Sequence, residues 1–258
     1  MRVIILAAGR GSRFGGLTDK IPKCMLRVCG VSILERQISF LKKTGVTDIY
    51  VIRSYKKEAI NIEGVNYVDH EPVDKDMVYS LFQAKELLHG DVLIVYGDIL
   101  YDKSIFENLN ALEGLSVICD SSWQNYFMLR FGEKMYDDLE SLVIRDGKIV
   151  KIGMKNPKPS DIDAQYFGMT KLDDASCKIL CDWYDSEDRE LMFRGKQFDK
   201  LQMTDLFQLL IDKGFKLKPY EVKKGWVEFD GISDISLVER KEKDNSLSEI
   251  INWSDVNE

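Results

Sequence analysis

The 258-residue sequence has only two histidines, His70 and His89, and five cysteines without regular spacing. An odd, unpatterned set of cysteines argues against a disulfide framework and indicates a reducing compartment. Cys177 and Cys181 lie one helical turn apart, but too few imidazoles exist to complete a zinc site with them. We therefore interpret these two cysteines as small buried apolar residues.

Long apolar runs and an excess of basic residues are also missing. No stretch reaches the ~18 apolar residues needed to span a bilayer, and the short apolar start lacks the cleavage region of a signal peptide. We therefore expect a cytoplasmic protein. The net charge of −7 and the pI near 5.1 supply no broad basic face, which excludes nucleic acid and anionic membranes as partners.

Neither an internal repeat nor a low-complexity linker divides the chain. Its 45% hydrophobic residues are enough for one large α/β core. The obvious loop, Asn156 to Ser160, is too short to separate domains. We predict a single domain over residues 1–258.

The first 25 residues carry the most distinctive pattern. The apolar run Arg2 to Leu6 predicts a buried strand, which leads directly into the small, glycine-rich segment Ala7 to Gly16. Backbone amides in such a loop bind phosphate. Five basic residues against one acid, Asp19, surround the loop: Arg2, Arg10, Arg13, Lys20 and Lys23. The expected ligand is a compact polyphosphate.

Three phosphate-binding patterns can be compared with this loop. The P-loop needs Gly-Lys-Ser/Thr, which is absent, and the dinucleotide fingerprint needs a third glycine where Phe14 stands. The third pattern fits. Leu6-Ala7-Ala8-Gly9-Arg10-Gly11-Ser12-Arg13 followed by Pro22-Lys23 resembles the signature of the nucleotidyltransferases that activate sugar phosphates and phospho-alcohols. The alternative is a tight turn with incidental arginines.

The following elements alternate between helix and strand. A capping box, Ser32 to Glu35, opens a helix that ends at Gly45, and strands are expected at 48–53 and 65–68 around a short helix at 56–60. Such a βαβαβ series predicts a parallel sheet with right-handed crossovers. The predicted fold class is α/β: a Rossmann-like, doubly wound, mixed but mainly parallel sheet with helices on both faces.

Later elements complete this prediction. Closely spaced strands at 115–119, 126–131, 141–144 and 148–152 suggest a small antiparallel excursion, which in the resembled fold carries acceptor specificity, over about 115–170. Strands are also expected at 165–169, 216–222 and 226–230. Helices are expected at 175–185 and 203–213, and in a helical tail over about 232–258.

Two acids follow predicted strands. Asp98 ends the central run 91–98, and ligands of open parallel sheets lie beyond the carboxyl ends of strands. A carboxylate beside a triphosphate is favourable if Mg²⁺ lies between them; the alternative is that Asp98 caps a helix near Lys103. The resemblance implies that Asp230 is the second magnesium ligand, with Glu228 near the acceptor. The residues alone also allow a solvated strand face.

Asp76 to Leu81 and Glu228-Phe229-Asp230 resemble the cytidylyltransferase branch that acts on phosphocholine and 2-aminoethylphosphonate. This resemblance implies Mg²⁺-dependent transfer of CMP from CTP, with release of pyrophosphate, for capsule or surface-polysaccharide decoration. The implied acceptor is a small phosphorylated or phosphonate compound such as phosphoglutamine, phosphocholine or aminoethylphosphonate. We expect a monomer or a homodimer.

The resemblance assigns catalytic roles to Arg13 and Lys23. It assigns nucleotide binding to Leu6, Ala7, Ala8, Gly9, Arg10, Gly11, Ser12, Asp76, Ser80 and Gly97. Asp76 stands where the branch has asparagine, and a carboxylate accepts from the cytosine amino group but cannot donate. Tyr79 and Ser80 alternatively only begin a helix.

Acceptor binding is expected at Trp123, Arg130, Tyr166 and Glu228. Trp123 offers an aromatic face for a cationic acceptor, and Arg130 offers a bidentate fork for a phosphate or carboxylate. Both could instead be core or interface residues.

Two other functions stay open: a sugar-1-phosphate nucleotidylyltransferase and a non-catalytic nucleotide-binding module. A Rossmann oxidoreductase is disfavoured by Phe14. The phosphate acceptor of a nucleotidyltransferase is already ionised near neutral pH, so the reaction needs no general base. The scarcity of histidine is compatible with this chemistry.

Overall fold

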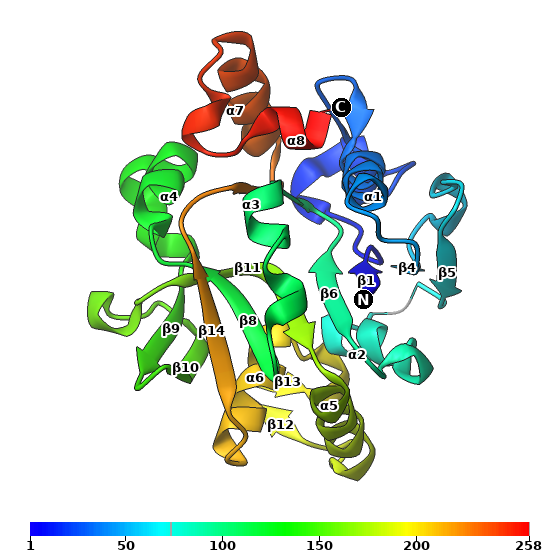
Figure 1. Ribbon diagram of the computed structural model, residues 1–258, viewed down its shortest axis with the longest axis vertical. Coiled ribbons are helices and arrows are strands. Elements are labelled where there is room, and N and C mark those ends of the chain that lie inside the picture. The colour runs from blue at the N-terminus through cyan, green and yellow to red at the C-terminus, as the bar shows by residue number, and fades with distance from the viewer. Residues whose placement is uncertain (73, 258) are drawn as a thin grey trace. The chain divides into compact units, whose positions relative to one another are not determined.

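The computed structural model describes residues 1–72 and 74–257 (Figure 1). Glu258, the last residue of the predicted tail, lies outside the described residues. The chain forms two compact units. The first contains Met1–Pro72, Ile94–Ala111 and Lys224–Glu258, and the second contains Val73–Leu93 and Leu112–Lys223. The prediction of a single domain stays a prediction.

The first unit contains the predicted βαβαβ series. Strands β1 (Arg2–Leu6), β4 (Ile49–Arg53) and β5 (Asn66–Asp69) pair in parallel, with Val3 opposite Ile49. The strand order is β5-β4-β1-β6, and β6 (Val92–Tyr96) enters this unit from the second. Every β6 residue from Val92 to Val95 is fully buried, as its apolar sequence predicts.

Helix α1 (Ile33–Lys43) begins as its capping box predicts. Glu35 N donates to Ser32 Oγ at 3.2 Å, and Ser32 N donates to Glu35 Oε2 at 3.1 Å. Leu34, Ile38 and Leu41 are buried at the expected helical spacing. Helix α8 (Trp253–Asn257) packs on α1 (Figure 1), where the Arg36 guanidinium lies 4.8 Å from the centre of the Trp253 ring.

The other elements of the first unit are short. They are β2 (Arg27–Val28), β3 (Val31–Ser32), β7 (Ile99–Tyr101), α3 (Lys103–Phe106), β15 (Trp226–Glu228), α7 (Ile232–Lys243) and α8 (Trp253–Asn257). Single 3-10 turns lie at Lys23–Met25, Lys57–Ala59, Leu109–Ala111 and Leu247–Glu249, and a longer 3-10 segment with a kink at Gly15 lies at Ser12–Thr18.

The second unit has a mixed run of strands in the order β11-β8-β14-β10-β9. Strand β8 pairs in parallel with β14, whereas β8 with β11, β10 with β14 and β9 with β10 are antiparallel. The strands are β8 (Leu115–Asp120), β9 (Glu140–Arg145), β10 (Lys148–Lys155), β11 (Gln165–Leu172), β12 (Met192–Phe193), β13 (Lys196–Gln197) and β14 (Leu217–Val222). Its helices are α2 (Met77–Phe82), α4 (Trp123–Phe131), α5 (Asp174–Ser186) and α6 (Met203–Asp212), with 3-10 turns at Lys85–Leu87, Gly132–Asp138, Pro159–Asp161 and Phe198–Lys200.

One predicted strand is wrong. Residues 126–131 belong to helix α4, so the region 115–170 is not an all-strand excursion. Aromatic residues favour strands in general, but here Trp123, Tyr126 and Phe127 are buried with the i, i+3, i+4 spacing of one helix face. Burial of that face outweighs the local strand preference.

The buried apolar side chains of the strands and of α1, α5 and α6 form the core. None of the helices within residues 1–72 and 74–257 combines the length and the apolar composition that crossing a bilayer requires.

Candidate active site

The loop after β1 is folded back on itself. Gly11 has left-handed backbone geometry (φ 75°) and precedes the 3-10 turn Ser12–Thr18, in which Phe14 is buried. The Thr18 hydroxyl, fully buried, lies 3.1 Å from Gly11 O and 3.2 Å from Gly15 O and can donate to either. These contacts hold the glycine-rich segment as a compact loop.

Backbone contacts bring the strand ends together at this loop. Gly97 N donates to Leu6 O at 2.9 Å, and a Cβ on Gly97 would lie only 3.0 Å from the same oxygen. Strands β7 and β15 pair antiparallel, and Phe229 N donates to Asp98 O at 3.0 Å. Asp98 and Asp230 are therefore neighbours because their backbones are paired.

Lys23 lies between these two acids. Its Nζ is 2.6 Å from Asp98 Oδ2 and 2.5 Å from Asp230 Oδ1. The three side chains are mostly buried, with exposed fractions of 13%, 16% and 20% for Lys23, Asp98 and Asp230. The stem of Lys23 packs against Gly11, where an added Cβ would lie 2.7 Å from Lys23 Cβ. The loop thus sets the position of the lysine.

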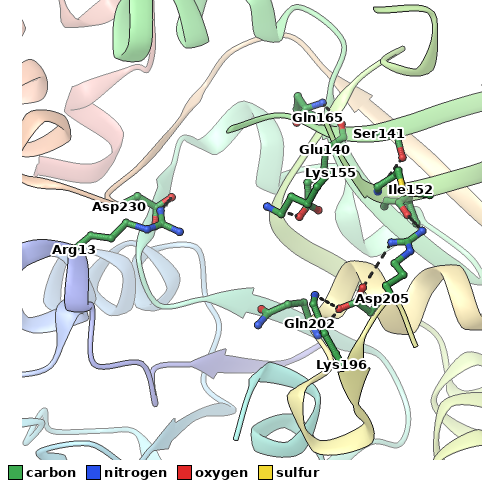
Figure 2. Close-up of polar contacts among 12 residues, drawn as sticks. Arg13, Glu140, Ser141, Ile152, Lys155, Gln165, Lys196, Gln202, Asp205 and Asp230 are labelled. Atoms are coloured by element: carbon green, nitrogen blue, oxygen red, sulfur yellow. Dashed lines mark hydrogen bonds and ion pairs between the residues drawn. The ribbon is translucent and has the colours of Figure 1, made fainter. Parts of the chain in front are cut away.

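Arg13 contacts the same cluster from the solvent side. Its Nη1 lies 3.4 Å from Asp230 Oδ2, and Figure 2 shows the two side chains directed toward each other. The Arg13 side chain is 65% exposed. Glu228, at the end of β15, adds a third acid, whose negative charge acts on Lys23.

These contacts keep the cluster charged. Burial alone would lower the pKa of Lys23, but the negative charges of Asp98, Asp230 and Glu228 outweigh burial and raise it. Burial alone would raise the pKa of Asp230, but the charge of Lys23, the hydrogen bond from Lys23 and the charge of Arg13 outweigh burial and lower it. Next to the cluster, burial and the Asp98 charge raise the pKa of the Cys24 thiol to about 12, so this thiol is not a nucleophile near neutral pH.

The acids fit a magnesium ion by their chemistry. Asp98 Oδ1 is buried and has no hydrogen-bond partner among the described residues, so one carboxylate oxygen is unsatisfied. Mg²⁺ prefers oxygen ligands and often takes only one or two carboxylates, completing its shell with water and substrate phosphates. Within residues 1–72 and 74–257, no group of three or more His, Cys, Asp or Glu side chains could hold a metal. The chain itself offers two carboxylates, from Asp98 and Asp230, and phosphate oxygens would have to come from a bound nucleotide.

The other predicted residues of the loop differ in exposure. Ala7 is buried and its N donates to Ile52 O at 2.9 Å, so this amide is used by the sheet. Gly9, Arg10 and Ser12 are exposed, while Leu6, Ala8 and Gly11 are half-buried. The Arg10 guanidinium lies 3.5 Å from Asp19 and 5.4 Å from the centre of the Tyr55 ring.

Asp76 and Ser80 belong to the second unit and lie at helix α2. Asp76 immediately precedes the helix, and its N donates to Asp199 O at 2.9 Å. Burial raises the pKa of Asp76, although a hydrogen bond with Gln202 and nearby lysines oppose the rise. Ser80 is buried. The alternative of a helix start describes the local structure, and nucleotide contacts at Asp76 and Ser80 stay predictions.

The predicted acceptor residues Trp123, Arg130 and Tyr166 are also in the second unit. Trp123 is only 3% exposed and packs edge-on against Phe127 and Tyr136, so its ring has no open face for a cation. The Arg130 guanidinium lies 4.6 Å from the centre of the Phe131 ring. The Tyr166 hydroxyl lies 3.0 Å from Thr170 Oγ1. Acceptor binding by these residues stays a prediction, and burial disfavours it for Trp123.

Three residues that support the site were missed. Asp234, 3% exposed, accepts from Asp230 N at 2.7 Å and from Gly231 N at 2.9 Å, which fixes the backbone of Asp230. Thr18 closes the loop, and Tyr55 donates from its hydroxyl to Thr18 O at 2.9 Å. The spacing Gly231 to Asp234 is a helix-start signal that could have indicated Asp234. Thr18 and Tyr55 have no comparable signal.

Helix α3, which begins at Lys103, is capped by Asp102 and not by Asp98, the cap considered as an alternative from the sequence. Asp102 Oδ1 accepts from Ser104 N at 3.2 Å, and Asp102 Oδ2 accepts from Asn252 N at 3.1 Å. Asp98 is thus not the cap of α3.

Residues 3–153 match the family model described as MobA-like NTP transferase domain. The chain is 31% identical over 254 residues to the CTP:phosphoglutamine cytidylyltransferase of Campylobacter jejuni subsp. jejuni serotype O:2, covering 92% of this chain and 98% of that protein. It is 31% identical over 246 residues to the bifunctional protein GlmU of Methanococcus aeolicus, covering 91% of this chain. The chain spans 54% of the length of that GlmU protein.

Solved structures share the fold. The CTP:phosphocholine cytidylyltransferase of Streptococcus pneumoniae superposes with a TM-score of 0.71 at 23% identity, covering 93% of this chain and 97% of that chain. The inositol-1-phosphate CTP transferase of T. maritima gives a TM-score of 0.71 at 19% identity, covering 93% and 96%. The predicted α/β class, a mixed and mainly parallel sheet with helices, is confirmed.

Proposed function

Because the chain belongs to the MobA-like NTP transferase family, we propose that it transfers CMP from CTP to a small phosphorylated or phosphonate acceptor and releases pyrophosphate. The observation that carries this proposal is the placement of Lys23 Nζ within hydrogen-bonding distance of both Asp98 and Asp230, beside the glycine-rich loop. Similarity to a cytidylyltransferase over 92% of the chain supports CTP as the nucleotide.

The reaction needs charge and positioning rather than a covalent nucleophile. An acceptor phosphate is already ionised near neutral pH, so its oxygen attacks the α-phosphorus without a general base. The exposed Arg13 donates to triphosphate oxygens, and backbone amides of the segment 9–12 complete the cradle. Lys23 donates to the α-phosphate and to the incoming acceptor oxygen, which reduces their mutual repulsion.

Asp98 and Asp230 would hold Mg²⁺. A bound magnesium ion would neutralise part of the negative charge that builds up on the leaving pyrophosphate. Asp234 contributes by fixing the Asp230 backbone, and the Phe229–Asp98 backbone bond keeps the two carboxylates together.

For the acceptor we propose phosphoglutamine first, because the relative that aligns over 98% of its own length carries that compound in its name. Phosphocholine comes second, since 134 residues are 36% identical to the choline-phosphate cytidylyltransferase of Streptococcus pneumoniae, covering 50% of this chain and 58% of that protein. We propose that the product is used for capsule or surface-polysaccharide decoration. We also propose that the enzyme is cytoplasmic, because its five free cysteines would stay reduced there.

The direct test measures pyrophosphate release from each NTP with a panel of acceptors, in the presence and absence of Mg²⁺. Release with CTP and one phosphorylated acceptor supports the proposal. Release only with UTP or dTTP and a hexose 1-phosphate selects the sugar-nucleotide reaction. No release with any pair, together with a higher melting temperature on adding nucleotide, selects a non-catalytic binding module.

Lys23→Ala gives the residue-level test. We expect kcat to fall by about two to four powers of ten, because a cation that acts mainly in the transition state is lost. Nucleotide binding, measured by calorimetry, should change by less than about tenfold. A variant with near-normal turnover removes Lys23 from the mechanism.

A further inference from the structure

We infer that the Lys23 ammonium and a divalent cation compete for the same two carboxylates, and that the triphosphate relieves this competition by giving Lys23 another anion. Lys23 is then the group that couples metal binding to nucleotide binding. The nucleotide half of this inference rests on the proposed function, whereas the competition itself can be tested without turnover.

The geometry makes the two cations mutually exclusive. One ammonium nitrogen lies 2.6 Å from Asp98 Oδ2 and 2.5 Å from Asp230 Oδ1. Mg²⁺ binds carboxylate oxygens at about 2.0–2.1 Å. An ion that contacts both of these oxygens would occupy the space that Lys23 Nζ fills. Asp98 Oδ1 has no hydrogen-bond partner among the described residues, so the metal has a further oxygen available once the ammonium moves.

Displacement of the ammonium by metal alone is unfavourable. The Lys23 side chain is only 13% exposed, and its charge is balanced by Asp98, Asp230 and Glu228. An ammonium that leaves two carboxylates inside a mostly buried site loses its partners before it regains water. Only the end of the side chain can move, because the stem is packed against Gly11. The free protein should therefore bind a bare divalent cation weakly.

A triphosphate bound at the glycine-rich loop would give Lys23 an alternative anionic partner. Gly11 is in contact with the Lys23 stem, so a triphosphate bound to the amides of segment 9–12 brings negative charge to the same lysine. Lys23 then exchanges carboxylates for phosphate oxygens and stays paired. Metal and nucleotide consequently tighten each other's binding, and linkage requires that this effect be equal in both directions.

The experiment titrates Mn²⁺ into the full-length chain without nucleotide and follows free Mn²⁺ by electron paramagnetic resonance. We expect Lys23→Met to bind Mn²⁺ about tenfold or more tighter than the wild type, a value typical of a coupling between sites. Arg13→Met is the matched control: it removes one positive charge 3.4 Å from Asp230, but this charge is exposed and is not bonded to both acids. Its Mn²⁺ affinity should change by less than about threefold.

A second titration adds a CTP analogue that cannot be cleaved. The wild type should then gain Mn²⁺ affinity more strongly than Lys23→Met does. Lys23→Gln repeats the test if the Met variant is not folded by circular dichroism. The inference is overturned if the folded variants bind bare Mn²⁺ no tighter than the wild type. If no nucleotide binds the wild type, the proposed function fails, but the first titration still decides the competition.

Discussion

At the scale of single residues, glycine is required at position 11 for two reasons, its left-handed backbone geometry and the close packing of Lys23 against it. Its φ of 75° suits glycine, and a Cβ there would lie 2.7 Å from Lys23 Cβ. Left-handed geometry costs other residues about 1–2 kcal/mol, and the clash would also push Lys23 away from the acids. We predict that Gly11→Ala lowers the free energy of unfolding by at least this amount, measured by urea denaturation, and lowers kcat in the pyrophosphate assay.

Gly9→Ala is the stability control for this variant, because a Cβ at Gly9 meets nothing within 4 Å and its φ is not left-handed. Its free energy of unfolding should stay within about 0.5 kcal/mol of the wild type. Equal stability and turnover for Gly11→Ala and the wild type would contradict the packing of Lys23 on this loop.

The Lys23–Asp230 pair also predicts how stability depends on pH. The pKa of Asp230 is lowered on folding, so its contribution is present above the unfolded value of about 3.9 and is lost as pH falls through the folded value. The pKa of Lys23 is raised on folding, so its contribution is fully present below about 10.4 and is lost as pH rises through the folded value. The stability difference between wild type and Lys23→Met should therefore be constant over about pH 5–9.

Urea denaturation of both proteins from pH 3 to pH 10 checks this prediction. We expect the difference in unfolding free energy to shrink at the acidic end, because Asp230 becomes protonated in the unfolded chain and then in the folded protein. A difference that is as large at pH 3 as at pH 7 would rule out a charged pair.

At the scale of elements, the start of α7 positions Asp230, the acid that we propose as a magnesium ligand. Asp234 accepts from the amides of Asp230 and Gly231, so Asp234→Ala leaves both without that acceptor. We predict a stability loss of about 0.5–2 kcal/mol, as for other helix caps, together with a fall in kcat. Asp173→Ala is the matched control, since Asp173 accepts from the Ser176 and Gly114 amides at the start of α5.

The control variant should lose a similar amount of stability in the same denaturation assay while keeping its kcat. If both variants keep kcat, Asp234 supports only the helix. If both lose it equally, the loss reflects general destabilisation rather than the position of Asp230.

The elements themselves were predictable where local signals agreed. The capping box and helical spacing of α1, and the unbroken apolar run of β6, predicted their structures because sequence, burial and periodicity point the same way. Helix α4 was mispredicted because its aromatic residues favour strands locally and only tertiary burial selects the helix. Support by Thr18 and Tyr55 was unpredictable, since their contacts are to backbone carbonyls that no side-chain pattern marks.

At the scale of the whole molecule, cleavage of the chain at one position would not separate the two compact units. The first comprises three chain segments and the second two, and strand β6 runs across a boundary between them. Neither unit can therefore be removed by a single truncation, and the single domain expected from the sequence stays a prediction. We therefore predict one cooperative thermal transition, with equal calorimetric and van't Hoff enthalpies in scanning calorimetry. Two resolved transitions would mean that the units unfold independently.

The composition of the site was predictable, but its internal pairing was not. The N-terminal motif indicated Arg13 and Lys23, and the end of a central parallel strand indicated Asp98. Asp230 was implied only by the family resemblance, because it follows β15, which pairs antiparallel with β7 outside the large sheet. The sequence cannot show that Lys23 bonds to both acids. That pairing depends on the β7–β15 ladder and on the packing of Lys23 against Gly11, which are tertiary contacts.

The separation of Lys23 and Asp230 by 207 positions has a consequence for synthesis on the ribosome. At about 5–20 residues per second, Lys23 is made on the order of ten to forty seconds before its acidic partner. During that interval the nascent chain has the cationic loop but lacks one of the two carboxylates that balance it. A chain released before strand β15 therefore lacks the complete site, so pairing of Lys23 with both Asp98 and Asp230 marks a product whose translation has passed Asp230.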